Sequence, residues 1–424
     1  MSSASSSVYQ QSDLESLASR SSVCSSSTTT LDDTIFTRTY NAALNIPHIH
    51  CSGKPHGEHT TNSLHSRPIT TTFDQAYDLF AQTSHMGILD PEYKVFTSQK
   101  GHGSLVYKIQ ARTVVVTGDP MCSEESRKPL LNELRHFRWA HGLVLAFVAV
   151  SESFAKYAQQ QGWVTMGFGH EKVINPLTNK ILRGQTGKRM LSQNKQLFDP
   201  KRGGVSMHLY IPSMDKPDFE LQDRLQKLYD DWRYEKTLKQ GAGSQTFVTV
   251  YDLFSYPEST IFLYTCDING QIHGLAVLRR LNNRGYHQDP CIASQDAPRG
   301  ITDLLIITAL QLLKKAGINY LSLGFEPLHT VQETKSHSKL QSRLLEHGYN
   351  RTIKSVPVTG KSAFFNKFHP DESLSSNLFI YLLSKGIPIR GSIALMHFAN
   401  INIRQLIAQP TLGNPHNEKQ TSYS

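Results

Sequence analysis

The residues whose types and spacing could do chemistry lie in one short stretch of the chain. His287 and Asp289 belong to a short apolar run, and an imidazole near a carboxylate could accept or relay a proton. An aspartate directly before Pro290 is also typical of a turn, so both interpretations of Asp289 stay open. Arg299 and Gly300 precede a predicted helix, where a cation and free backbone N–H groups could bind a phosphate or a developing oxyanion.

The elements that must position these residues span residues 261–328. Asn269-Gly270 is a tight-turn dipeptide between two apolar, strand-like runs. Residues 301–316 have helical spacing of apolar residues, two lysines in the last turn and a glycine just past the end. Asp303 lies in the first turn of this helix, where an acid usually stabilises the helix dipole and substrate binding is the alternative. A strand predicted at 319–323, closing on a glycine, completes an α/β unit.

An earlier part of the chain has a similar order of elements, without a residue-by-residue repeat. The sequence therefore predicts an α/β (α+β) fold with two units that share a similar order of strands and helices. In the first unit, strands are predicted at 94–97, 103–110, 112–117, 143–150 and 164–168, with helices at 72–84, 124–141 and 154–161.

The two ends of the chain differ from these units in composition. The first 30 residues contain 13 serines, and residues 1–66 are predicted to be a disordered Ser/Thr-rich leader, because they cannot bury enough apolar area to offset their ordering entropy. The predicted units are residues 67–215 and 216–330. Residues 331–424 are predicted to be a C-terminal helical extension and tail that docks on the core or lies on a membrane.

Positive charge is concentrated between the two predicted units. Residues 171–204 carry eight basic and two acidic residues, which accounts for most of the net charge of +9. Such a run is either a surface that binds phosphates, of tRNA or of lipid headgroups, or a solvated helix face. The scarcity of accompanying acids leaves these two interpretations equally open.

The chain shows no signal for a disulfide framework, a metal site or a membrane span. Its five cysteines are odd in number and lack CxxC spacing, which predicts free thiols in a reducing compartment. Four histidines between residues 48 and 59, with Cys51, match no standard zinc spacing, so no metal is predicted. The longest apolar run, 143–150, is far shorter than the about 20 residues of a membrane span. We therefore expect a cytoplasmic protein, or one bound peripherally to a membrane or lipid droplet.

Four motifs in order carry a resemblance to a known family: Gly118-Asp119-Pro120, Gly169-His170-Glu171, the block 285–328 and the aromatic-basic run 364–370. Over roughly residues 67–399 the chain resembles the C-terminal synthase domain of the lysyl-phosphatidylglycerol synthases. That domain consists of two tandem GNAT acyltransferase units and transfers an aminoacyl group from aminoacyl-tRNA to a lipid hydroxyl. With a Ser-rich leader and neither a transmembrane half nor a synthetase module expected, the chain looks most similar to the free-standing fungal sterol aminoacyltransferases, which esterify ergosterol.

The resemblance implies transfer of an aminoacyl group, expected to be glycine from glycyl-tRNA, onto a sterol 3-hydroxyl. The alternatives are transfer to phosphatidylglycerol or to a peptide amine, and a non-catalytic module that binds membrane or RNA. The expected partners are aminoacyl-tRNA and a membrane lipid, while the oligomeric state is left open. The donor ester is already activated, so no cofactor is expected. The loop 294–300 has one glycine and a proline that removes an N–H donor, which disfavours an acyl-coenzyme A donor.

The resemblance also implies roles for individual residues. Asp289 is expected to bind the substrate α-ammonium or to orient a proton relay, with His287 as a base and Arg299 as a further catalytic residue. Of the motif at 169–171, only Glu171 matches the family's usual Gly-Glu-Glu. The expected substrate-binding residues are Glu171, His170, Asp303 and Gly300, and the expected tRNA contacts are Lys188, Arg189, Arg183 and Lys195.

Overall fold

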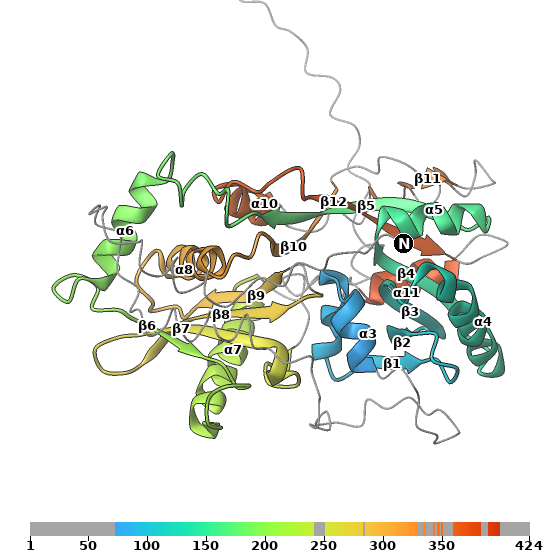
Figure 1. The fold of residues 1–424 in the computed structure, drawn as a ribbon, viewed down its shortest axis with the longest axis horizontal. Coiled ribbons are helices and arrows are strands. Elements are labelled where there is room, and N and C mark those ends of the chain that lie inside the picture. Colours follow the sequence, from blue (N-terminus) through green and yellow to red (C-terminus); the bar gives the residue numbers. More distant parts are fainter. Residues whose placement is uncertain are drawn as a thin grey trace, which may run out of the picture.

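The computed structural model describes residues 73–240, 251–282, 285–328, 359–382 and 389–398, with isolated positions between 334 and 350. The predicted disordered leader, residues 1–66, and the histidines within it lie outside the described residues. Strands throughout the described part of the chain form one mixed sheet, with helices on its faces (Figure 1). The predicted α/β class is confirmed.

The first half of the sheet begins as an antiparallel meander. Strand β3 then pairs in parallel with β4, and the helix α4 connects the two. Helix α4 starts where the side chain of Ser123 accepts a hydrogen bond from the Ser126 backbone N–H, the usual way in which serine caps a helix. The elements are β1 (Lys94–Thr97), β2 (Ser104–Gln110), β3 (Thr113–Met121), α4 (Glu124–Ala140) and β4 (Val144–Val150), followed by α5 (Glu152–Gln160) and β5 (Val164–Ile174).

The second half repeats this pattern. Its meander ends in a strand, β9, that pairs in parallel with β10 after the helix α8. The hairpin predicted at Asn269-Gly270 is present between β7 and β8. The elements are β6 (Ser206–Tyr210), β7 (Thr260–Cys266), β8 (Ile272–Arg280), β9 (Tyr286–Ala293), α8 (Ile301–Lys315) and β10 (Leu321–Pro327).

The residues predicted as a helical extension, 331–424, contain helices α10 (Thr359–Asn366) and α11 (Ile389–Phe398), but also a strand, β12 (Ser376–Leu382). Strand β12 lies between β4 and β5 and pairs antiparallel with both. The short β11 (Thr334–Lys335) pairs with β5. The resulting strand order is β1-β2-β3-β4-β12-β5-β10-β9-β8-β7-β6, in which the β5–β10 pair joins the halves. Strand β6 was not predicted. It lies within the predicted first unit, residues 67–215, but pairs with β7 of the second, and the unit boundaries stay predictions.

Three strands run past a glycine at which the sequence predicted them to end: β3 past Gly118, β5 past Gly169 and β10 past Gly324. In each case the ladder with a neighbouring strand shifts register close by. Gly118 and Gly324 have φ angles of 74° and 90°, in the left-handed region that favours glycine. Glycine therefore accommodates a bulge in these strands instead of terminating them.

The two faces of the second half carry different helices. Helix α8 covers one face, where its Ile301 is buried in the same core as Leu278 of β8. Helix α7 (Phe219–Gln240) covers the other face, where Val277 of β8 is buried. The chain preceding β1 also packs on this second face, as helix α3 (Phe73–Phe80) and the 3-10 helix η1 (Thr83–Leu89), so the single helix predicted at 72–84 is broken. In Figure 1, α3 accordingly lies between the two halves.

Candidate functional site

The site is centred on the place where β9 and β10 separate. The two strands pair only at Tyr286 with Leu321 and at His287 with Ser322, after which β10 continues along β5. Strand β9 continues to Ala293, so the residues after His287 lie beside an opening inside the sheet. Asp289 lies there, within a strand and not in a turn.

The carboxylate of Asp289 is held by a buried tyrosine. The Tyr251 hydroxyl donates a 2.6 Å hydrogen bond to Asp289 Oδ2, and Tyr251 is only 4% exposed. Burial, together with the negative charge of Asp289, raises the pKa of Tyr251 well above its ordinary value. The phenol therefore stays protonated and donates its hydrogen bond to the Asp289 carboxyl group.

Arg279 lies on the same face of the sheet and was not predicted. It is the register partner of His287 on β8 and is only 1% exposed. None of its three side-chain nitrogens has a hydrogen-bond partner in the part of the chain that the structure describes. A signal was available, because Leu275, Val277 and Arg279 alternate along one strand and the first two are apolar.

His287 is buried as well. Its Nδ1 donates to the backbone carbonyl of Ser322 at 3.2 Å, which fixes the position of the proton in the neutral ring. This contact orients the imidazole beside the strand opening. The predicted role of His287 as a base stays a prediction.

The 3-10 helix η1 brings His85 close to Arg279. Burial lowers the pKa of His85, and the positive charge of Arg279 lowers it further. His85 Nδ1 accepts from the Gln82 backbone N–H at 2.9 Å, and Nε2 donates to the Asp119 carbonyl at 2.8 Å, so both ring nitrogens of the neutral imidazole are engaged. A Cβ on Gly118 would lie 2.7 Å from Nε2. The motif Gly118-Asp119-Pro120 thus has a structural role around His85.

Glu171 approaches η1 from the first half. The Thr83 hydroxyl donates to Glu171 Oε1 at 2.5 Å, and the Ser376 hydroxyl of β12 lies 3.4 Å from Oε2. Glu171 is 7% exposed, so this predicted substrate residue is buried and its hydrogen bonds link η1, β5 and β12. His170, its neighbour on β5, is half-buried and pairs in register with Glu326.

The start of α8 meets the site from the other face of the sheet. Gly300, with a φ of 101°, begins the helix without a side-chain cap, and Arg299 is exposed. Asp303 forms an ion pair with Lys367 of the aromatic-basic run. Burial, followed by the nearby charges of Asp289 and Asp303, raises the pKa of the Cys291 thiol.

The basic segment, residues 171–204, contains an ion-paired lysine on β5 and a group of exposed basic side chains on and just before α6. Lys172 forms ion pairs with Glu326 and Glu372, both at 3.6 Å, so its charge is compensated. Helix α6 (Lys188–Phe198) starts at Gly187 with no side-chain cap and no acid in its first turn. It projects at one end of the molecule, next to α8 (Figure 1). The four predicted tRNA contacts are exposed on or just before α6: Lys188, Arg189, Arg183 and Lys195.

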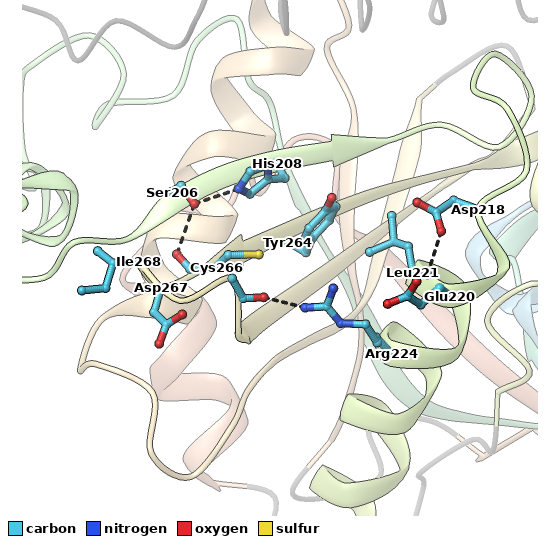
Figure 2. Close-up of a pocket in the computed structure, with 11 residues that line it drawn as sticks. Ser206, His208, Asp218, Glu220, Leu221, Arg224, Tyr264, Cys266, Asp267 and Ile268 are labelled. Carbon is cyan, nitrogen blue, oxygen red and sulfur yellow. Dashed lines mark hydrogen bonds between the residues drawn. The ribbon is translucent and has the colours of Figure 1, made fainter.

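A cavity of about 470 Å³ lies elsewhere, under α7 at the β6 edge of the sheet (Figure 2). Ser206 Oγ and His208 Nε2 are 2.7 Å apart at its wall, and Arg224 donates to the Gly270 carbonyl at 2.5 Å. None of the predicted site residues lines this cavity. We place the candidate site at the strand opening, because buried charges converge there.

In the part of the chain that the structure describes, no group of three or more His, Cys, Asp or Glu side chains is arranged to hold a metal ion. No helix in this part is both long and apolar enough to cross a membrane.

Two halves with the same order of strands and helices, joined through β5 and β10, define the class as the tandem α/β fold of the GNAT type that the sequence predicted. The chain belongs to the family "Phosphatidylglycerol lysyltransferase, C-terminal", whose model matches residues 76–376. It is 24% identical to the phosphatidylglycerol lysyltransferase of Bacillus subtilis over 68% of this chain and 32% of that protein. It is 22% identical to an uncharacterized protein of Corynebacterium glutamicum over 63% of this chain and 33% of that one. The chain thus spans about a third of the length of these curated relatives.

The solved structure of L-PGS from Bacillus licheniformis has a similar fold. It superimposes with a TM-score of 0.56 at 18% identity, covering 76% of this chain and 92% of that chain. This similarity confirms the predicted tandem architecture, since it extends over both halves.

Proposed function

We propose that this chain transfers an aminoacyl group from aminoacyl-tRNA to the hydroxyl of a membrane lipid. The observation that carries the proposal is the Asp289 carboxylate, which a buried tyrosine holds at the strand opening. Membership of the lysyltransferase family supports the reaction type. The names of the relatives favour phosphatidylglycerol as the acceptor over the sterol that the sequence resemblance implied.

In the proposed reaction, Asp289 binds the α-ammonium of the aminoacyl group. A carboxylate at a half-buried position, with a neutral donor on one oxygen, can pair with an ammonium on the other. This contact would position the ester so that its carbonyl carbon faces the acceptor hydroxyl. The chemistry needs orientation, proton movement and stabilisation of the oxyanion, all of which protein groups can supply.

The exposed start of α6 is proposed to hold the tRNA. Lys188 and Arg189 lie in the first turn, where the backbone N–H groups of a helix also favour an anion. Contacts of this kind bind phosphates with little dependence on sequence and weaken as salt rises. They suit a donor whose acceptor stem is recognised mainly through its backbone.

The test is a reconstituted transfer assay. The purified protein is mixed with tRNA charged with radiolabelled lysine or glycine, and with vesicles that contain phosphatidylglycerol, ergosterol or neither. Labelled lipid that appears only with phosphatidylglycerol supports the proposed acceptor, whereas label only on ergosterol would replace it with the sterol. No labelled lipid with any vesicle would refute the proposed reaction.

A mutant pair links the activity to the site. Asp289→Asn should abolish transfer, because the amide cannot bind the ammonium as a carboxylate does. Asp230→Asn, the same change at an exposed position of α7, is the matched control and should leave transfer unchanged. Equal activity of the two variants would exclude Asp289 from the site.

A further inference from the structure

Arg279 is the unusual feature of the site. A guanidinium carries five N–H donors, and at 1% exposure it has lost nearly all contact with water. Its nitrogens have no hydrogen-bond partners among the described residues. A buried charge without a partner strongly destabilises a fold, so folded proteins seldom contain one without a functional reason.

No described group forms a hydrogen bond or an ion pair with Arg279. The imidazole of His85 already uses both ring nitrogens in backbone contacts. The Tyr251 hydroxyl donates to Asp289, and the charge of Arg279 acts on both Tyr251 and His85, which places the guanidinium near them. The guanidinium therefore has N–H groups that could donate to an anionic oxygen of a substrate.

The direction in which Arg279 points is set by the strand register. Its partner on β9 is His287, and Asp289 follows two residues later on the same face, where Tyr251 packs. The cation and the carboxylate thus occupy neighbouring positions on one face of the β8–β9 pair. An aminoacyl ester has a matching pair of groups, an α-ammonium and, two carbons away, the ester carbonyl oxygen.

We propose that Arg279 donates hydrogen bonds to the carbonyl oxygen of the aminoacyl ester and stabilises the oxyanion that forms during transfer. This inference rests on the proposed function and assigns a catalytic residue to it. Water is excluded from the guanidinium, so its attraction for a developing negative charge is stronger than at the surface.

The step balances without a further reactant. The acceptor hydroxyl oxygen forms a bond to the acyl carbon, and the carbonyl oxygen takes up the negative charge next to Arg279. The bond from the acyl carbon to the tRNA ribose oxygen then breaks, and the proton lost by the acceptor hydroxyl ends on that ribose oxygen. Nothing is oxidised or reduced.

The experiment compares Arg279→Gln and Arg279→Lys with the wild type in the vesicle assay. Because the oxyanion forms during the reaction and is absent from the bound ground state, kcat should fall by about 100- to 1,000-fold in Arg279→Gln while KM for the charged tRNA stays near the wild-type value. Arg279→Lys should have a kcat between those of Arg279→Gln and the wild type, since lysine retains the positive charge. Arg280→Gln, the same change one residue along, removes an ion pair to Asp78 and is the matched control with unchanged kcat.

Thermal unfolding of the same variants provides the second readout. If Arg279 serves the reaction, Tm should stay unchanged or rise when this buried cation, which has no hydrogen-bond partner among the described residues, is replaced by a neutral side chain. A raised KM with normal kcat would instead mean that Arg279 binds a ground-state anion, such as a tRNA phosphate, and would overturn the proposal. A lower Tm with normal kcat in the folded fraction would mean that Arg279 stabilises the fold, and would also overturn the proposal.

If the wild-type protein labels no lipid at all, the proposed function fails before Arg279 is tested. The Tm comparison still decides then whether Arg279 supports the fold. The failure of the function and the failure of this inference are therefore distinguishable.

Discussion

Removing one oxygen atom, in Tyr251→Phe, tests how far the positioning of Asp289 contributes to the reaction. The hydrogen bond is short, at 2.6 Å, its donor is 4% exposed, and its acceptor is a carboxylate. A buried hydrogen bond to a charged group contributes about 1.5–3 kcal/mol. If the whole amount serves to hold Asp289 against the α-ammonium, kcat/KM should fall about 10- to 150-fold, at 1.4 kcal/mol per factor of ten.

The assay is initial-rate transfer of label from charged tRNA to vesicle lipid, with thermal unfolding of each variant measured in parallel. Tyr210→Phe is the matched control, because its hydroxyl also has a hydrogen bond, with Gln222, but lies on the edge strand β6. The control should retain wild-type kcat/KM. A Tyr251→Phe variant that folds and transfers within about twofold of the wild type would refute the role given to this contact.

Three further predictions follow from the site and its surroundings. Burial lowers the pKa of His85, so on acidification the unfolded chain binds this proton before the folded protein does. The free energy of unfolding should therefore decrease below about pH 6.5, by up to about 1.4 kcal/mol per pH unit. Urea unfolding from pH 7 to 5 should show a weaker pH dependence of this free energy for His85→Gln. Gly118→Ala should destabilise the fold by about 1–3 kcal/mol, because its Cβ would lie 2.4 Å from Ser84 Oγ at a φ of 74°; a melting curve that matches the wild type would contradict this. Replacing Lys188 and Arg189 together by alanine should weaken tRNA binding and reduce the slope of log affinity against log salt by roughly 2, measured by filter binding, while an unchanged slope would remove α6 from the tRNA surface.

Local patterns in the sequence predicted most of the elements, but pairings between distant segments were not predictable from them. The Asn269-Gly270 turn and the helix with two terminal lysines depend on residues next to each other, and both are present. The apolar run at 376–382 looks the same whether it docks as a helix or pairs as a strand, since only β4 and β5 decide its state.

The same holds for the site: neighbouring residues in the sequence identified some of its members, whereas others could be recognised only from contacts with distant segments. Asp289 was found because it lies in a strand-like run, and the alternative that it is a turn residue could be rejected only once β9 was seen to continue. Arg279 was missed, because a pair of arginines at the end of a strand looks like a solvated terminus. Its burial depends on η1, about 200 residues earlier in the chain, which packs on that face of the sheet.

The insertion of β12 has a consequence for how the protein is made. Ser376 meets Glu171 across 205 residues, so the slot between β4 and β5 stays empty while the whole second half is being synthesised. During that time two neighbouring strands expose unpaired edges, which are sites for association with other chains. Nascent protein should therefore depend on chaperones until residue 382 has left the ribosome, and a stop codon placed just before β12 should yield aggregated protein rather than a shorter folded one.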